Sequence, residues 1–309
     1  MKAVFLDRST IDPSIDLSPI KLAAGELVEF SLTSTEQILD RAQGAEIIVT
    51  NKVILGENEL AKLPKLKLIC VAATGMNNID LKAAEKHNVC VKNVEGYSNH
   101  SVTQHVFSYL LSVVSNVPAY LKNDKQNPWS QSSKFCQIDF PVNELFGMKL
   151  GILGFGNLGQ SIAKVAEAFG MQLLIAERAD SEVVRPGRVS FETMLAESDV
   201  ISLHCPLTDS TLRLFDSDVF AQMKTGAIFI NTARGPIVDS LALVEALKSG
   251  KVSHAIVDVL EQEPPSSDHP LIQVDVPNLT LTHHIAWGSL QAQRTLIAGI
   301  AENIRNSIN

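Results

Sequence analysis

The stretch LGILGFGNLGQSIAKVAEAFGMQLLIAER, residues 150–178, decides the fold of this chain. It begins with a short apolar run typical of a buried strand, turns at closely spaced glycines and continues with apolar residues at helical spacing. A second apolar run then ends at Glu177. A strand, a turn, a helix and a second strand in this order form the unit from which parallel sheets are built. We therefore predict a doubly wound α/β domain around these residues.

The glycine-rich turn GFGNLG, residues 154–159, has the spacing GxGxxG. Its first glycine permits a tight turn, the second lets a pyrophosphate approach the backbone, and the third lets helix and strand pack closely. Free N–H groups at the start of the helix would face the phosphates. The motif alone is weak, but its position between a strand and a helix gives it meaning. We predict dinucleotide binding through Gly154, Phe155, Gly156, Asn157, Leu158 and Gly159.

Glu177, at the end of the second strand, lies 18 residues beyond the last glycine of the turn. An acidic residue in this place hydrogen-bonds the adenosine ribose hydroxyls and repels a 2'-phosphate, so NAD is predicted rather than NADP. Arg178 leaves an alternative open, because its guanidinium could stack on adenine or bind that phosphate. A Glu–Arg pair in solvent, without any role in binding, is the structural alternative.

The alternation of strands and helices extends over the whole chain. After residue 149 we predict strands at 150–153, 172–176, 200–203, 227–231, 254–259 and 279–282, and helices near 159–169, 191–198, 217–223 and 240–250. Before residue 100 we predict strands at 2–6, 27–32, 46–50, 66–73 and 89–94, and helices at 34–44 and 80–88. These patterns predict a small α/β unit before residue 100 and a parallel, doubly wound sheet covered by helices after residue 149.

Three further segments lie outside this alternation. A long amphipathic helix begins at Ser101, ends before Pro118 and is predicted to start the second domain, and a polar, proline-bearing connecting loop follows at 123–147. A last helix, 289–308, has no strand after it and is predicted to cross back to the first domain.

The composition argues against several classes of protein. A length of 309 residues favours two domains, and a net charge of -8 without a basic run argues against nucleic-acid binding. No apolar run approaches the roughly 18 residues of a membrane span, and the start of the chain is unlike a secretory signal, so we expect a cytoplasmic protein. The separated cysteines indicate neither disulfides nor a zinc site; they are Cys70, Cys90, Cys136 and Cys205.

Three polar side chains follow three of the predicted strands: Arg234 in NTARGPIVD, Glu263 in DVLEQEPP and His284 in LTHHIAWGS. Open parallel sheets bind ligands at the carboxyl ends of their strands, so we expect these side chains in one crevice. An arginine can bind a carboxylate at two points, a histidine can carry a proton near neutral pH, and a glutamate can keep that histidine protonated. Beside a dinucleotide turn, they predict reduction of a 2-oxo acid, with hydride from NADH and a proton from the histidine.

His283 competes with His284 for the catalytic role. Adjacent residues on a strand point to opposite faces, so only one of the two can face the substrate. Adjacent histidines can also mark a metal site, but no cluster of Asp, Glu or Cys at ligand spacing supports one, and no metal is predicted.

These motifs resemble those of the D-isomer-specific 2-hydroxyacid dehydrogenases. The resemblance joins GFGNLG, the acidic Glu177, NTARGPIVD, the EP after DV and HHIAW in the correct order, and it covers nearly the whole chain. Within that family, AATGMNN at 72–78, PWSQSSKFC at 128–136 and HIAW at 284–287 are most similar to the glycerate dehydrogenase (hydroxypyruvate reductase) branch.

The resemblance implies a substrate-binding domain at 1–98 plus 286–309 and an NAD-binding domain at 99–285. Both would be doubly wound domains with parallel sheets, one flavodoxin-like and one Rossmann-like, with an interdomain cleft that closes on the substrate. A homodimer built through the NAD-binding domains is also implied. Carried over by position, Arg234, Glu263 and His284 are the catalytic residues, Asp258 lies near the nicotinamide carboxamide, Thr74, Gly75 and Met76 meet the substrate carboxylate, and Trp287 lines the substrate pocket.

Two positions depart from the family pattern. Proline commonly precedes the catalytic histidine, where this chain has His283, and aspartate commonly stands in the place of Glu177. The first departure leaves the assignment of the two histidines open, whereas the second keeps the charge. Met76 adds a flexible apolar side chain near the substrate, which could admit larger 2-oxo acids.

Alternatives to a reductase of hydroxypyruvate and glyoxylate stay open at this point. One is a broader 2-oxo acid reductase. A phosphoglycerate dehydrogenase is disfavoured, because no regulatory domain follows and no basic cluster is present for a second phosphate. A nonenzymatic NAD sensor, resembling the co-repressors built on this scaffold, would not need the intact Arg–Glu–His set.

Overall fold

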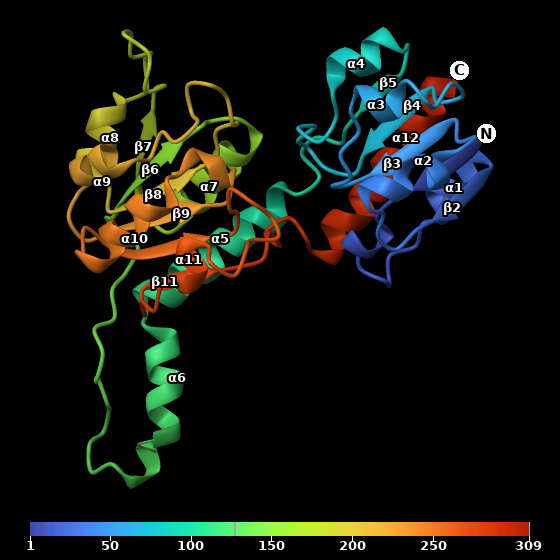
Figure 1. Ribbon diagram of the computed structural model, residues 1–309. Coiled ribbons are helices and arrows are strands. Elements are labelled where there is room, and N and C mark those ends of the chain that lie inside the picture. Colours follow the sequence, from blue (N-terminus) through green and yellow to red (C-terminus); the bar gives the residue numbers. More distant parts are fainter. Residues whose placement is uncertain (127, 309) are drawn as a thin grey trace. The chain divides into compact units, whose positions relative to one another are not determined.

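The computed structural model describes residues 1–126 and 128–308, which divide into two compact units (Figure 1). Unit 1 contains residues 1–98 together with the residues from Gly288 onward, and unit 2 contains Asn99–Trp287. Each unit is built on a parallel sheet with helices packed against it, which confirms the predicted fold class. A cleft between the units stays a prediction.

Five parallel strands form the sheet of unit 1, in the order β2-β1-β3-β4-β5. They are β1 (Lys2–Phe5), β2 (Glu26–Glu29), β3 (Ile47–Thr50), β4 (Leu68–Val71) and β5 (Cys90–Lys92), and each coincides with a predicted strand. β3 and β4 are buried over their whole length, as expected for strands that are covered on both faces. The order is the flavodoxin-like one.

The helices of unit 1 come from both ends of the chain. They are α1 (Ser18–Ala24), α2 (Ile38–Ala42), α3 (Glu57–Leu60), α4 (Leu81–Lys86) and α12 (Leu290–Ile308), with 3-10 turns at Arg8–Thr10 and Thr35–Gln37. The short α1 and α3 are not predicted, because segments of at most two turns show too little periodicity. α12 packs against α1 and β4. Gly299 of α12 also lets the helix approach the segment after β5, since a Cβ there would lie 2.7 Å from a methyl carbon of Val94.

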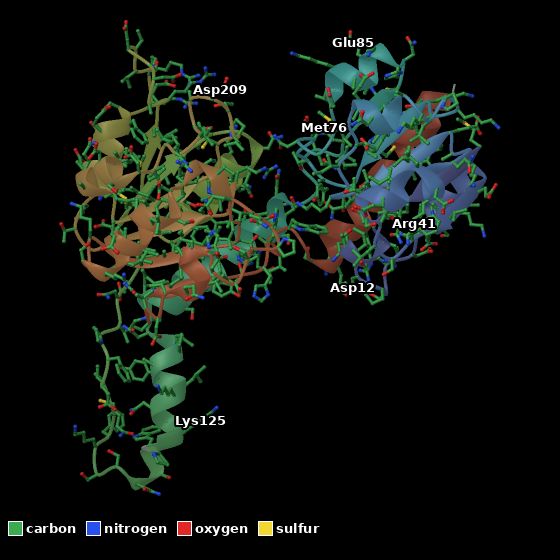
Figure 2. The ribbon with its side chains drawn as sticks, in the orientation of Figure 1. Asp12, Arg41, Met76, Glu85, Lys125 and Asp209 are labelled. Carbon is green, nitrogen blue, oxygen red and sulfur yellow. The ribbon has the colours of Figure 1, made fainter. Side chains whose placement is uncertain are left out.

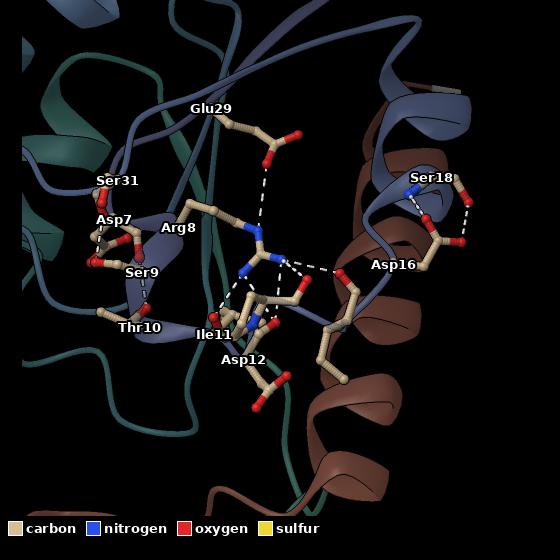
Figure 3. A network of polar contacts seen from close by, with 12 residues as sticks. Asp7, Arg8, Ser9, Thr10, Ile11, Asp12, Asp16, Ser18, Glu29 and Ser31 are labelled. Carbon is tan, nitrogen blue, oxygen red and sulfur yellow. Dashed lines mark hydrogen bonds and ion pairs between the residues drawn. The ribbon is translucent and has the colours of Figure 1, made fainter.

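Asp7 and Arg8 organise the loop after β1 (Figure 3). The Arg8 guanidinium donates to the Ile15 carbonyl at 3.1 Å, and its Nε lies 3.4 Å from the Glu29 carboxylate. The buried Asp7 carboxylate accepts a hydrogen bond from the Asn51 N–H at 2.9 Å. Desolvation by burial raises the pKa of Asp7, although these backbone bonds oppose the rise. Both side chains therefore have structural roles in unit 1.

Six parallel strands form the sheet of unit 2, in the order β11-β10-β9-β8-β6-β7. They are β6 (Lys149–Leu153), β7 (Gln172–Ala176), β8 (Val200–Leu203), β9 (Ala227–Asn231), β10 (Val252–Val257) and β11 (Leu279–Leu281), and all six are predicted strands. After β7 the chain returns past β6 to form β8 on the other side. Ligands bind at such a switch point, beyond the carboxyl ends of the strands.

Helices of unit 2 pack against this sheet or against one another. They are α5 (Asn99–Val114), α6 (Val117–Gln126), α7 (Asn157–Ala168), α8 (Phe191–Glu197), α9 (Ser217–Gln222), α10 (Ser240–Lys248) and α11 (Pro270–Gln273), with 3-10 turns at Trp129–Gln131 and Gly235–Ile237. A cluster of aromatic rings, Phe215, Phe220 and Phe229, lies in the core with ring centroids 5.1 to 5.8 Å apart. This core fixes the strands whose ends carry the polar residues of interest.

The segment from Asn99 to the start of β6 differs from its prediction. The single helix predicted to run from Ser101 to just before Pro118 is two helices, because Asn116 adopts a positive φ of 52° between α5 and α6. Pro118 lies in the first turn of α6, where its missing N–H costs nothing. The loop predicted from Asn123 is therefore wrong at 123–126, which are helical. Asn127 lies outside the described residues.

Within the residues that the structure describes, no helix is both long and apolar enough to span a bilayer. Cys70, Cys90, Cys136 and Cys205 are free thiols. The cytoplasmic location stays a prediction.

Candidate active site

Each glycine of the turn meets a different packing demand. Gly154 has a φ of +96°, and a Cβ there would lie 2.4 Å from the backbone nitrogen of Cys205. A Cβ at Gly159 would lie 2.2 Å from the Gly154 carbonyl oxygen. At Gly156, the N-cap of α7, a Cβ would meet nothing within 4 Å. The turn thus leaves open space before a helix N-terminus, whose N–H groups and dipole favour a pyrophosphate, so these residues fit a dinucleotide.

Glu177 follows β7 and is almost fully buried, but its carboxylate already has a cationic partner. Arg185 donates to it from Nε and from Nη2, at 2.5 Å each. The Arg178 N–H adds a bond of 3.1 Å, and Arg188 Nε lies 3.9 Å away. The hydrogen bonds from Arg185 lower the pKa of Glu177 to about 2, so the carboxylate is ionised near neutral pH. Ribose binding by Glu177 stays a prediction, and it must accommodate this ion pair.

Glu263 and His284 form a direct pair. The Nδ1 atom of His284 lies 2.5 Å from Oε2 of Glu263, and the other carboxylate oxygen accepts the Leu260 N–H at 3.0 Å. His284 is about one-quarter exposed. Because Nδ1 faces the glutamate, Nε2 lies at the opposite edge of the ring. Of the two adjacent histidines, His284 contacts the glutamate, whereas His283 is exposed.

Asp258 holds the segment that carries His284. Its backbone carbonyl accepts the His284 N–H at 2.8 Å, and its buried carboxylate accepts the N–H groups of Ile285 and Ala286 at 2.9 Å each. These bonds hold His284 at a φ of 54°, a conformation that is uncommon for a residue with a side chain. His284 follows the strand as predicted, but the strand alternation invoked to separate it from His283 does not apply, because β11 ends at Leu281 and both histidines occupy the turn after it.

The environment of Asp258 extends to helix α5. Thr282 Oγ1 donates to the Asp258 carboxylate at 2.5 Å and lies 3.3 Å from Nε2 of His105. His105 lies 3.9 Å from the same carboxylate. Burial lowers the pKa of His105, while the negative charge of Asp258 acts in the opposite direction. Asp258 is thus a positioning residue in this structure, and contact with a nicotinamide carboxamide stays a prediction.

Arg234 lies just beyond β9, the strand between β8 and β10. Asn231 orients this turn, since its side chain donates to the Arg234 carbonyl at 3.1 Å and accepts the Ala233 N–H at 3.0 Å. The guanidinium donates to the Ala233 carbonyl at 2.6 Å. Among the described residues no carboxylate forms a salt bridge with Arg234, so its charge is available to an anionic ligand.

The turns that carry Arg234 and Glu263 are packed backbone to backbone. A Cβ at Gly235 would lie 1.9 Å from the carbonyl carbon of Leu260, so only glycine fits there. Ser240 also donates its N–H to Glu261 at 3.2 Å. Since β9, β10 and β11 are neighbours in the sheet, their carboxyl ends place Arg234, Glu263 and His284 along one edge of unit 2.

The residues predicted to meet the substrate lie on separate elements. Thr74, Gly75 and Met76 follow β4 in unit 1, where the Thr74 carbonyl accepts a bond of 2.6 Å from the Asn93 side chain. Figure 2 labels Met76. Met76 packs partly against the apolar core of unit 1. Trp287, at the end of unit 2, packs against the core beside α5. Their substrate contacts stay predictions.

Three further polar residues lie at the site and carry no signal in the sequence: His105, Arg185 and His204. The first has the spacing of an ordinary helix residue, and the second lies in an irregular loop. His204 follows β8 beside the glycine turn, and burial lowers its pKa to about 3, so it is neutral. Within the described residues its Nδ1 has no hydrogen-bond partner, and no group of three or more His, Cys, Asp or Glu is placed to hold a metal ion.

Similarity to known proteins shows the family to which the chain belongs. Residues 107–286 match the model of the D-isomer specific 2-hydroxyacid dehydrogenase, NAD binding domain. The chain is 40% identical over 304 residues to a glycerate dehydrogenase of Methylorubrum extorquens, which covers 98% of this chain and 95% of that protein. It is 32% identical over 311 residues to a hydroxypyruvate reductase of Blautia hydrogenotrophica, which covers 98% and 96%.

A solved structure has the same architecture. The D-lactate dehydrogenase from Aquifex aeolicus, complexed with NAD and lactic acid, matches with a TM-score of 0.82 and 28% identity, covering 99% of this chain and 95% of that chain. The family model lies entirely within unit 2, which holds the glycine turn and the three polar residues. The chain therefore belongs to the D-isomer specific 2-hydroxyacid dehydrogenase family and is an oxidoreductase that uses NAD.

Proposed function

We propose that the chain reduces hydroxypyruvate to D-glycerate, and glyoxylate to glycolate, with NADH as the reductant. The observation that carries this proposal is the Glu263–His284 pair at the sheet edge that also presents Arg234 without a carboxylate partner among the described residues. The names of the relatives, a glycerate dehydrogenase and a hydroxypyruvate reductase, support this choice among 2-oxo acids.

In this mechanism, NADH supplies the hydride for the carbonyl carbon when it is bound in front of the glycine turn. His284 donates a proton from Nε2 to the carbonyl oxygen as negative charge develops there. Glu263 holds Nδ1 at 2.5 Å, which fixes the ring orientation and stabilises the imidazolium. Arg234 binds the substrate carboxylate and polarises the carbonyl. The hydride and the proton together convert the 2-oxo acid into the 2-hydroxy acid.

A panel of 2-oxo acids, assayed by the loss of NADH absorbance, tests this function. We expect the highest kcat/KM for hydroxypyruvate, lower values for glyoxylate, and much lower values for pyruvate and its branched analogues. Equal values across the panel would favour a broad 2-oxo acid reductase. If no substrate is turned over while NADH still binds, the chain would instead be a cofactor sensor.

We propose a homodimer formed through unit 2. The observation behind it is an arm, residues 117–126 and 128–146, in which α6 precedes an extended return segment (Figure 1). Tyr120 ties the two parts together by donating to the Phe140 carbonyl at 2.7 Å. Large apolar side chains of the arm are exposed, Phe135 at 94% and Ile138 at 76%. Such a patch on one protomer marks a contact surface for another.

The arm gives a direct prediction for assembly. Phe135→Asp combined with Ile138→Asp should convert a dimer into a monomer, because two charges would be buried without partners in the interface. Sedimentation velocity measures the change in mass. Leu22→Asp is the matched control, since Leu22 is an equally exposed apolar residue in unit 1. A wild-type monomer, or dissociation of the control as well, would contradict the proposed interface.

A further inference from the structure

Glu177 and Arg185 form the best-aligned ion pair near the glycine turn. The guanidinium bonds both carboxylate oxygens side-on, through Nε and Nη2 at 2.5 Å each. Both partners gain from such a pair, because charge-assisted bidentate bonds are short and strong. The Glu177 side chain is 3% exposed, whereas that of Arg185 is 56% exposed. The arginine therefore lies on the solvent side of a buried carboxylate.

This placement matters for any ligand that reaches Glu177. The exposed guanidinium bonds both oxygens of the buried carboxylate, so a ribose hydroxyl that bonds Glu177 would lie close to Arg185. A carboxylate has about four acceptor sites and this arginine uses two of them, so hydroxyl groups can still be accepted. Nη1 of Arg185 takes part in neither bond with Glu177, and among the described residues no hydrogen bond from it is found, so it can meet a further anion.

The charges around Glu177 should repel the 2'-phosphate of NADPH only weakly. Arg185 neutralises Glu177, and Arg188 lies 3.9 Å from the same carboxylate. Arg188 is also tied to the end of β7, because its Nη1 donates to the Ala176 carbonyl at 3.1 Å. An isolated carboxylate would repel a 2'-phosphate, but the field at this site is the sum of one negative and at least two positive charges.

We propose that Arg185 sets how strongly this chain discriminates between NADH and NADPH, by neutralising Glu177 and presenting Nη1 to the 2' position of the adenosine ribose. The inference rests on the proposed placement of that ribose at Glu177, but on no choice of substrate. It makes Arg185 a specificity-determining residue of the cofactor site. Glu177 then selects for ribose hydroxyls only in combination with its arginine partner.

Equilibrium binding tests this proposal without any turnover. The dissociation constants of NADH and NADPH are measured by the fluorescence of the bound nicotinamide, and the ratio of the NADPH constant to the NADH constant is compared among variants. In Arg185→Gln, the ratio should rise about tenfold or more, because Glu177 is left as an unneutralised charge facing the phosphate. In Glu177→Gln, the ratio should fall about tenfold, because Arg185 is released to bind the phosphate.

Two further variants complete the design. The double variant Glu177→Gln with Arg185→Gln should lose most of the gain in NADPH affinity that Glu177→Gln shows alone. Arg178→Gln removes the same charge from an exposed neighbour whose backbone, rather than its side chain, contacts Glu177, and its ratio should stay within about threefold of the wild type. The melting temperature of each variant shows whether the fold is kept.

The outcomes test the placement of the ribose at Glu177 separately from the role of Arg185. If Glu177→Gln changes the ratio but Arg185→Gln does not, the ribose lies at Glu177 and the role of Arg185 is wrong. An equal change in Arg178→Gln and Arg185→Gln also overturns it, because the effect would then be general charge. If neither Glu177→Gln nor Arg185→Gln alters either constant, the placement of the ribose itself is wrong. The inference is supported if the ratio of the NADPH to the NADH dissociation constant rises in Arg185→Gln but not in Arg178→Gln.

Discussion

The His284→Asn variant is expected to reduce hydroxypyruvate about 10²- to 10⁴-fold more slowly than the wild type, which is the range that general acid catalysis contributes. Without this imidazole, the proton donor that Glu263 holds in place is lost as hydride arrives. Asparagine suits this position, because His284 adopts a φ of 54° and asparagine tolerates that conformation better than alanine. The effect should appear in kcat, measured with saturating NADH.

His283→Asn is the matched control for this variant. It makes the same chemical change one residue earlier, in a side chain that is exposed while His284 contacts Glu263. We expect its kcat to stay within about twofold of the wild type. A comparable loss of kcat in both variants would mean that the turn, rather than the proton donor, is disturbed. Full activity in His284→Asn would remove the histidine from the mechanism.

The second large effect is expected at Arg234. Arg234→Gln should lower kcat/KM for hydroxypyruvate by about 10²- to 10³-fold, because loss of one partner from a desolvated charge pair costs about 2–5 kcal/mol. The loss should appear mainly as a higher KM, with NADH affinity nearly unchanged. Arg234→Lys should recover only part of the loss, because an ammonium keeps the charge but cannot bind a carboxylate in two-point fashion.

Arg305→Gln provides the comparison, since Arg305 is an exposed arginine on α12 that lies outside the proposed site. Its kinetic constants should match those of the wild type. If Arg234→Gln binds and reduces hydroxypyruvate as well as this control, the substrate carboxylate is held elsewhere. A fall in NADH affinity equal to the fall in kcat/KM would indicate a disturbed cofactor site instead.

The sequence predicts the strands of both sheets because buried parallel strands consist of continuous apolar runs. β9, AIFIN, is one example, and every one of its residues is buried. The prediction is weaker where local signals conflict. Pro118 indicates the end of a helix, but it occupies the first turn of α6, and only the positive φ of Asn116 reveals the break before it. Short helices such as α3 have no pattern long enough to detect.

In the candidate site, too, some features can be recognised in the sequence and others depend on tertiary contacts. Gly154, Gly156 and Gly159 are recognisable because each serves a local backbone requirement within one strand–turn–helix unit. Arg234 and His284 are recognisable by chemical type and by their position after strands. The positive φ of His284 is invisible in the sequence, because it depends on hydrogen bonds to Asp258, 26 residues earlier in the chain.

The sequence by itself therefore determined the strands of the two sheets, the glycine turn and the chemical types of the proposed catalytic residues, since these follow from periodicity and from short motifs. Only the tertiary structure decided which histidine contacts Glu263, what holds it there, and that Arg185 occupies the carboxylate of Glu177. These features are contacts between side chains and backbone groups brought together by folding. Their partners are separated by loops, and loops carry no periodic signal.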